Sequence, residues 1–530
     1  MSRTLLLIGV SLAVILGVPL ALRPGGAEGP PAGARTLIVI TPHTAQIRRE
    51  FADGFNIWHQ AHYGEPVAVD YRVPGGTSEI MRLLEDQYRA ALRQGAFEIG
   101  PGGEIVMARG TVQFDLMFGG GSYDHGRLKS GVREEIVFEG ERTEVSVPMS
   151  TPVGIDPDVL ETIFGPNRVG AQPLYDPEQY WIGVAMSSFG IVFNRDELRA
   201  LGLAEPTSFE DLTDPRLVGR IALADPRQSG SITTTFDSIL NNYGWDDGWR
   251  ILREMCANAR SFSSSSTKPP IDVAQAEAVM GLAIDFYGRA QAEAVGGGRV
   301  GYAEPSGAVY IDPDPVSVLR GGPSPELARR FVEYCMSEEA QALWQFPPVD
   351  QQTPAEARGG LRRADGEAAG PRRWALRRLP ARRIMYEQYA EVMVDHVDPF
   401  AAASPVESRG WRSAIGLMMG AFGVDTVEEA RAAWTALAGL REQAGAGAVS
   451  RELVERAEAA FYAFPPTRLP DGQVLPFAPE TYRQVRDAWR EPDESNPNRI
   501  GAGAAKIAYT KFFQEQYRLV LRIEREARGE

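Results

Sequence analysis

The sequence is poor in the residues that most metal and redox sites require. Its 530 residues include two cysteines, Cys256 and Cys335, and five histidines. No Cys-x-x-Cys pair and no Cys/His cluster is present, which argues against a structural zinc site. The two cysteines leave two alternatives open, a pair of buried thiols or a disulfide.

Positive charge is also in short supply. The chain has 55 Lys and Arg against 70 Asp and Glu, which gives a net charge of −15. Nucleic-acid binding relies on a basic surface, so this balance argues against nucleic acid as a partner. A small anionic ligand stays compatible with it, because such a ligand responds to the local field rather than to the total charge.

The common catalytic signatures are missing as well. The chain has no Walker A motif, no G-x-S-x-G and no H-E-x-x-H. Its glycine runs at 75–76 and 119–121 do not form a G-x-G-x-x-G dinucleotide loop. Together with the low histidine content, this predicts a protein that is not an enzyme.

The N-terminal 34 residues differ from the rest of the chain. A single basic residue, Arg3, precedes an uncharged apolar stretch at 4–22, and a Pro/Gly/Ala-rich stretch follows it. Its length lies between the ~7–15 residues of a signal-peptide core and the ~20 residues of a membrane span. We predict that residues 1–34 are a signal peptide or an N-terminal membrane anchor, with the remaining chain on the extracytoplasmic side. No cysteine follows the apolar run, so a lipobox is excluded.

From residue 36 onward, apolar patterns alternate between strand and helix periodicity. An apolar run at 37–40 predicts a buried strand, and the spacing of Ile47, Phe51 and Phe55 predicts the helix after it. This order predicts parallel α/β sheets covered by helices. Further strands are expected at 67–73, 114–118, 182–193, 221–224, 279–286 and 308–311, with closing helices at 324–336 and 337–344.

Beyond residue 350 the composition changes. Residues 351–383 are rich in Arg, Gly, Ala and Pro and contain four Arg-Arg pairs, which indicates a linker or a strap lying on the surface. Residues 384–530 show helical apolar spacing, as at Trp411, Ile415 and Met418. We expect an all-α extension of five or six helices there.

Five stretches within residues 36–344 carry a resemblance to a known family. They are 37–58, 73–78 (Val-Pro-Gly-Gly-Thr-Ser), 221–234 (Ile-Ala-Leu-Ala-Asp-Pro-Arg-Gln-Ser-Gly-Ser-Ile-Thr-Thr), 273–289 and 305–344. In this order they resemble the iron(III)-type extracellular solute-binding family of ABC importers, which has the type II periplasmic binding protein fold. Residues beyond 351 lie outside the resemblance.

The resemblance implies two Rossmann-like lobes joined by a hinge of crossing strands, with the ligand bound between them. Lobe 1 would comprise residues 35–185 and 305–350, and lobe 2 residues 186–304, with crossings near 184–193 and 303–311. It also implies a monomeric receptor in the periplasm. Such a receptor passes a small molecule or ion to an ABC permease in the inner membrane.

Candidate ligand-binding residues lie where predicted strands run into helices. In open α/β sheets, ligands bind beyond the carboxyl ends of the strands, and helix N-termini suit oxyanions. Each group of candidates named below could instead only cap a helix. The serine run 263–266 could also line the cleft, or it could be a flexible loop. The candidates are Thr41, His43 and Thr44 after the first strand, Gly76, Thr77 and Ser78 after the second, and Ser229, Gly230 and Ser231 in lobe 2.

The sequence Asp285-Phe286-Tyr287 bears on the ligand class. Iron-binding members of the resembled family have two adjacent tyrosines here and a histidine in the first loop, because ferric iron prefers hard oxygen ligands. By this resemblance, His43 and Tyr287 are candidate metal ligands for Fe(III) with a bound anion. The chain departs from the pattern at Phe286, where Asp285 could supply an oxygen instead, and at 119–122, where some iron binders have a carboxylate.

Arg289 follows this motif and has two interpretations. It could pair with a carboxylate or phosphate ligand in a two-pronged manner, or with Asp285. The sequence favours three ligand classes in decreasing order: a small oxyanion or phosphorylated solute, ferric iron with a co-bound anion, and a cationic or zwitterionic solute. The alternative function is an envelope sensor or interaction protein that binds a partner through residues 384–530.

Overall fold

The computed structural model describes residues 33–530 apart from 102–103, 139–140, 306 and 351. The predicted signal peptide or anchor at 1–34 therefore lies almost entirely outside the described residues. Among the helices that are described, none combines the length and the hydrophobicity needed to cross a membrane.

Lobe 1 is built on parallel strands whose connections are helices. The ladder places β1 between β2 and β5, all in parallel. Because parallel strands end at one edge of a sheet, the helices that follow them begin at that edge. The elements are β1 (Arg35–Ile40), α2 (Ala45–Tyr63), β2 (Val67–Arg72), α3 (Thr77–Arg93), β5 (Leu116–Phe118) and α4 (Ser122–Ser130).

Lobe 2 repeats this arrangement with a smaller sheet. β10 pairs in parallel with both β11 and β12, and helices begin just beyond these strands. Its elements are α6 (Arg195–Ala200), β10 (Ile221–Ala224), α7 (Gly230–Ala257), β11 (Ala259–Ser263), α8 (Lys268–Ala274), β12 (Met280–Ile284), α9 (Asp285–Ala294) and β13 (Val300–Ala303).

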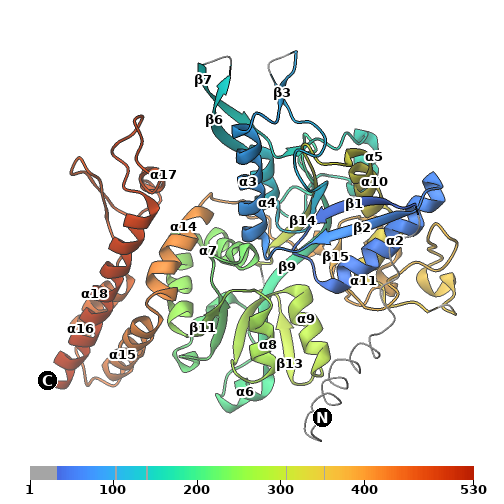
Figure 1. Ribbon diagram of the computed structural model, residues 1–530. Coiled ribbons are helices and arrows are strands. Elements are labelled where there is room, and N and C mark those ends of the chain that lie inside the picture. Colours follow the sequence, from blue (N-terminus) through green and yellow to red (C-terminus); the bar gives the residue numbers. More distant parts are fainter. Residues whose placement is uncertain (1–32, 102–103, 139–140, 306, 351) are drawn as a thin grey trace, which may run out of the picture.

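Two long antiparallel strands join the lobes. β9 (Ile182–Asn194) pairs with β14 (Ile311–Leu319) through its first half and with β12 and β13 through its second half. The strands thus form one continuous path, β11-β10-β12-β9-β14-β5-β1-β2, that runs through both lobes. The α/β fold class with a helical C-terminal region is confirmed (Figure 1).

The strand expected at 308–311 is wrong in its bounds, because β14 begins at Ile311 and continues to Leu319. Pro313 and Pro315 lack the N–H donor of a ladder and so resemble a loop in sequence. The structure accommodates Pro315 with a register shift next to Asp314.

Residues 94–180 add smaller elements to lobe 1, and two helices close it. Within this range the sequence patterns predicted only the strand at 114–118, which is β5; the other strands are short or polar. At the N-cap of α11, the Ser337 hydroxyl accepts from the backbone N–H of Ala340. The elements are β3 (Glu98–Ile99), β4 (Ile105–Val106), β6 (Val132–Phe138), β7 (Glu141–Val147), β8 (Ser150–Thr151), α5 (Pro157–Phe164), α10 (Pro325–Met336) and α11 (Glu338–Gln345).

Residues 352–403, here called the strap, lie along lobe 1. The Glu50 carboxylate accepts from the backbone N–H groups of Arg372 and Arg373, each at 2.8 Å. Further on, the short strand β15 (Leu379–Pro380) pairs with β9. The strap also carries the short helices α12 (Ile384–Gln388) and α13 (Pro399–Ala402).

Residues 404–530, here called the tail, pack on lobe 2 instead (Figure 1, orange to red). Apolar side chains of the tail, such as Met418 and Phe513, share one core with Trp249 and Leu252 of α7. Its elements are α14 (Arg412–Met419), α15 (Val427–Gly445), α16 (Arg451–Tyr462), the strand pair β16 (Thr467–Arg468) and β17 (Val474–Leu475), α17 (Tyr482–Ala488) and α18 (Ala502–Arg528).

The two cysteines are free, buried thiols, and they lie on different lobes. Cys256 is in α7 and packs in the core shared with the tail, whereas Cys335 is in α10 of lobe 1. The sequence left buried thiols or a disulfide open, and the structure has two buried thiols.

Candidate ligand-binding cleft

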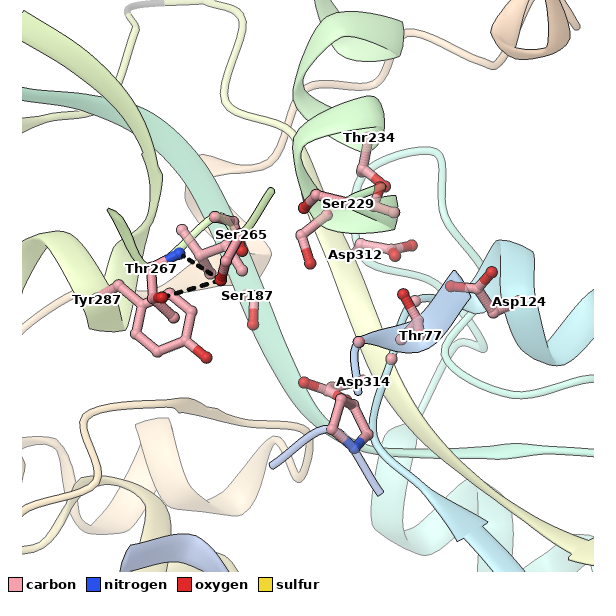
Figure 2. A pocket seen from close by; sticks show the side chains of 18 of the residues that line it. Thr77, Asp124, Ser187, Ser229, Thr234, Ser265, Thr267, Tyr287, Asp312 and Asp314 are labelled. Carbon is pink, nitrogen blue, oxygen red and sulfur yellow. Dashed lines mark hydrogen bonds between the residues drawn. The ribbon is translucent and has the colours of Figure 1, made fainter. Parts of the chain in front are cut away.

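A cavity of about 270 Å³ lies between the two lobes, at the hinge strands. The loops after β1, β2 and β5 line it from lobe 1, and those after β10, β11 and β12 line it from lobe 2. Figure 2 shows Thr77 and Asp124 on one side of this cavity and Tyr287 and Ser265 on the other. Strand ends of both sheets therefore face a shared space, as open α/β sheets predict.

Most of the predicted site residues line this cavity. They are His43, Gly76, Thr77, Ser229, Gly230, Ser231 and Tyr287, together with residues 264–266 of the serine run. Residues far apart in the sequence are thus brought together by the two sheets.

Five predicted residues do not line it. The Thr41 hydroxyl is buried and donates to the Phe118 carbonyl at 2.6 Å, which fixes the first loop. Thr44 is the N-cap of α2, and Ser78 lies in the first turn of α3. Arg289 donates to Glu304 at 2.8 Å, so its main ion pair is with that residue rather than with Asp285.

Asp285, the fifth, lies buried in lobe 2 at the start of α9. Neither carboxylate oxygen has a hydrogen-bond partner among the described residues. Burial raises the pKa of this carboxyl group to about 7, despite the opposing effect of Arg289. The group is therefore held partly protonated near neutral pH.

Four helices of at least nine residues begin at the cavity, and three of them lack a side-chain cap. The N-cap residues of α3, α4 and α9 are Gly76, Gly121 and Ile284, which carry no hydrogen-bonding side chain. In α7 the Ser229 hydroxyl accepts weakly from Ile232, at 3.5 Å. The positive ends of four helix dipoles thus favour an anion here, while in α4 the first N–H, that of Ser122, already donates to the Asp312 carboxylate.

The lobes approach closely where α3 and α7 begin. A Cβ atom added to Gly230 would lie 2.8 Å from the Thr77 hydroxyl and 3.3 Å from the Asp124 carboxylate, both in lobe 1. The structure therefore has the lobes in contact across the cleft, and glycine at this position permits it.

His43 contributes a neutral imidazole to the cavity wall. Its ring packs edge-on against Phe118, with the centroids 4.5 Å apart, and its Nε2 atom has no hydrogen-bond partner among the described residues. Burial, followed by the nearby Arg378 guanidinium, holds the pKa of His43 well below its usual value. The ring can accept or donate one hydrogen bond but brings no positive charge.

The sequence patterns missed Arg378, which lines the cavity from the strap. Its guanidinium carbon lies 4.2 Å from the centre of the Phe286 ring in lobe 2 and 5.9 Å from the Trp344 ring in lobe 1. It forms an ion pair with Asp314 of β14, while its Nε atom has no hydrogen-bond partner among the described residues. Burial lowers its pKa to about 10, so it stays cationic at neutral pH.

Carboxylates also line the cavity, but most are engaged. Asp312 of β14 accepts from the Ser122 hydroxyl at 2.6 Å and from the Ser122 N–H at 3.2 Å. Burial raises the pKa of Asp312 to about 6. The Asp314 carboxylate is balanced by its ion pair with Arg378, so the groups left to contact an anion are the remaining donors of that guanidinium and the helix starts.

The donor set fits a ferric ion poorly. Among the described residues, no group of three or more His, Cys, Asp and Glu side chains could hold a metal. The candidate ligands His43 and Tyr287 both line the cavity, but burial raises the pKa of the Tyr287 phenol and disfavours the phenolate. In addition, Phe286 is covered by the Arg378 cation, which would repel a metal ion.

The middle of the chain matches a known family. Residues 160–363 match the model of the bacterial extracellular solute-binding proteins. The predicted resemblance is confirmed over this segment. The matched family is one of binding proteins; that the whole chain lacks enzymatic activity stays a prediction.

Two curated relatives match part of the chain. A protein of Haemophilus influenzae is 28% identical over 173 residues, which are 32% of this chain and 49% of that protein. The phosphoglycerate transport regulatory protein PgtC of Salmonella typhimurium is 28% identical over 168 residues, 31% of this chain and 40% of that protein. The chain thus spans about half the length of the curated relatives it matches, or less.

Solved structures with a distant likeness include a periplasmic binding protein and an iron-bound protein. AfuA of Actinobacillus pleuropneumoniae, solved with fructose-6-phosphate, is 19% identical, with 58% of this chain and 82% of that chain covered and a TM-score of 0.44. Iron-bound HitA of Pseudomonas aeruginosa is 17% identical, with 72% and 99% covered and a TM-score of 0.45. These likenesses are too remote to transfer a ligand.

Proposed function

We propose that this protein is the extracytoplasmic solute-binding component of an ABC importer and holds a small phosphorylated or other oxyanionic solute between its lobes. The observation that carries the proposal is the buried Arg378 guanidinium, which shares one cavity with the starts of α3, α4, α7 and α9. Cation and helix N-termini together favour an anion over a metal ion. The family match and the name of PgtC, a relative tied to phosphoglycerate transport, support this class.

Binding works through closure of the two lobes. Hydroxyls of Thr77 in lobe 1 and of Ser229 and Ser231 in lobe 2 line the same cavity, so one oxyanion contacts both lobes. A ligand that makes these contacts only in the closed state stabilises that state by its differential affinity. The receptor would then act as a monomer in the periplasm and deliver its ligand to a permease in the inner membrane.

Calorimetry on the purified protein tests this proposal. We expect 3-phosphoglycerate to bind more tightly than glycerate, because the phosphate group supplies the charge that the cavity recognises. Ser229→Ala combined with Ser231→Ala should weaken binding by about tenfold, since two hydrogen bonds to a charged group are lost. Equal affinities for glycerate and phosphoglycerate, or an unchanged affinity of the double variant, would count against the oxyanion site.

Ferric iron is tested in the same preparation. A phenolate–iron complex would give a visible charge-transfer band that Tyr287→Phe removes. We expect no such band after ferric loading in the presence of phosphate, given the raised pKa of the Tyr287 phenol. A band that depends on Tyr287 would indicate that the ligand is ferric iron with a co-bound anion rather than an oxyanion alone.

A sensing role is the second candidate, and the contact between tail and lobe 2 favours it. Because tail and lobe 2 share one core, the tail moves whenever lobe 2 moves. PgtC, moreover, is named as a regulatory protein. Crosslinking of the intact protein in membranes, with and without phosphoglycerate, separates the roles. A partner that is captured in only one ligand state and is not a permease would favour sensing.

A further inference from the structure

The start of the tail is anchored on the ligand-facing end of lobe 2. Arg412, the first residue of α14, donates from Nη1 to the Thr234 hydroxyl at 2.8 Å and from Nη2 to the Gly230 carbonyl at 3.0 Å. Both acceptors are in the first two turns of α7, and both residues line the cavity. The two-pronged contact fixes the guanidinium relative to lobe 2.

The same guanidinium also contacts lobe 1. Its carbon lies 4.4 Å from the centre of the Tyr123 ring, at the start of α4. Tyr123 is 47% exposed, so its ring is not held in the lobe 1 core. A cation over an aromatic face is attractive, and this pair joins groups that belong to different lobes. Opening of the cleft must separate them.

The surroundings of Arg412 strengthen this link. It adjoins a second cavity of about 440 Å³ that is lined by lobe 1, lobe 2, the hinge and the tail. The buried carboxylates Asp124, Asp237 and Asp312 come from α4, α7 and β14, and the positive charge of Arg412 lowers the pKa of each against the effect of burial. One tail cation is thus shared by carboxylates of both lobes and of the hinge.

A second contact holds the tail to the same loop of lobe 2. Arg227, two residues before Ser229, donates to Asp425 of the tail at 2.9 Å and pairs with Asp225 beside it. The tail therefore contacts this end of lobe 2 at two points, the loop before α7 through Asp425 and the first turns of α7 through Arg412. Loop, helix start and tail form one body.

We propose that Arg412 is a positioning residue that latches the closed cleft, holding the start of α7 for the ligand and drawing Tyr123 of lobe 1 onto it. The inference deepens the proposed function, because it identifies a tail residue that sets the stability of the closed state of that cleft. Its effect on the distance between the lobes needs no ligand, so it can be tested even if the ligand class is wrong.

Spin labels report the distance between the lobes. Both native cysteines are buried, so labels can be placed at Val159→Cys in lobe 1 and Ala200→Cys in lobe 2, two exposed helical positions. Pulsed-dipolar distances are then compared for the otherwise unchanged chain, Arg412→Gln, Tyr123→Leu and Tyr123→Phe, all without ligand. Tyr123→Phe is the matched control, since it keeps the aromatic face. Because Tyr123 is half exposed, its replacement leaves the core intact.

We expect Arg412→Gln and Tyr123→Leu to shift the closed-to-open ratio toward open by about 3- to 10-fold, and Tyr123→Phe to behave like the parent. With 3-phosphoglycerate as the probe, the dissociation rate should rise by a similar factor in the first two variants. Unchanged distances in folded Arg412→Gln and Tyr123→Leu proteins would overturn the latch, as would Tyr123→Phe behaving like Tyr123→Leu. A parent protein that binds no phosphorylated probe excludes a phosphorylated solute as the ligand, while the distances still decide on the latch.

Discussion

The strap and the tail follow one another in the chain, yet they meet the two lobes in opposite ways. The strap sends one side chain, Arg378, into the cleft, where it touches an aromatic ring of each lobe. The tail instead receives a side chain from lobe 2: Arg253 of α7 donates to the carbonyls of Phe461 and Ala463 and is enclosed by aromatic rings of the tail. The strap therefore adds a cation to the site, whereas the tail completes the core of lobe 2 and contacts the wall of the cleft through Arg412.

The difference shows why an added segment need not be a separate module. An independent tail would have its own core, but here Ile415, Met418 and Phe513 pack directly on α7. An inert linker would be polar and exposed, but Arg378 is buried between the lobes. Each segment is thus part of the two-lobed unit: the strap supplies a buried cation to the cleft, and the tail joins lobe 2 through a shared apolar core and through the contacts of Arg253 and Arg412.

Deleting residues 404–530 should have the largest effect. The deletion exposes the α7 side chains that now form a shared core with the tail, including Trp249 and Leu252. Burial of one large apolar side chain contributes about 1.5–3 kcal/mol, and several are uncovered at once. We expect insoluble protein or loss of a cooperative thermal transition by circular dichroism. A soluble, cooperatively folding truncation would show that the tail is a separate module after all.

A pH-dependent loss of stability is expected where the strap meets lobe 2, at Asp285. Its pKa is about 7 in the folded chain, because of burial, against about 3.9 when unfolded. Between these values the folded state holds a proton that the unfolded state has lost, so stability falls as the pH rises from about 4 to about 7. The unfolding free energy should drop by about 2–4 kcal/mol more in the parent than in Asp285→Asn across this window.

Denaturant titrations at pH 4, 5.5 and 8 measure this difference. The exposed Asp158→Asn variant on α5 is the control and should keep the pH slope of the parent. If Asp285→Asn also keeps that slope, the carboxyl group is ionised in the folded protein, and its burial is offset by Arg289 and Arg378.

Two of the buried arginines, Arg378 and Arg253, should separate affinity from stability. Arg378→Gln removes the cation from the cleft and should weaken phosphoglycerate binding by about 10- to 100-fold, the effect of losing a charged hydrogen bond. Arg253→Met is the matched variant. Because it leaves two tail carbonyls without this donor, it should lower the melting temperature and leave the affinity unchanged. Calorimetry and thermal unfolding on both proteins give the comparison. Equal loss of affinity in the two variants would mean that the strap acts only through folding.

How far the sequence could predict this molecule depends on the range of the interactions involved. Strand and helix starts such as Thr77 and Ser231 were predictable, because local periodicity and turn residues mark them and sheet topology brings their loops together. Arg378 could not be found this way, since its neighbours Phe286, Asp314 and Trp344 are distant in sequence, and an Arg-Arg pair in a Pro/Gly-rich stretch resembles a solvated surface. The same holds for Arg412, whose partners come from two lobes.

Gly230 offers the smallest and most local test of cleft closure. Its φ is not positive, so alanine is acceptable to the backbone. The added Cβ meets the Thr77 hydroxyl and the Asp124 carboxylate only when the lobes are together. Gly230→Ala should therefore leave the melting temperature of the ligand-free protein near that of the parent and weaken phosphoglycerate binding by about tenfold, equivalent to about 1.4 kcal/mol. Ser231→Ala, one residue on, removes a hydroxyl without adding bulk and so separates steric from polar effects. If Gly230→Ala binds as the parent does, the ligand is held with the lobes further apart than they are here, and the contact between α3 and α7 plays no part in binding.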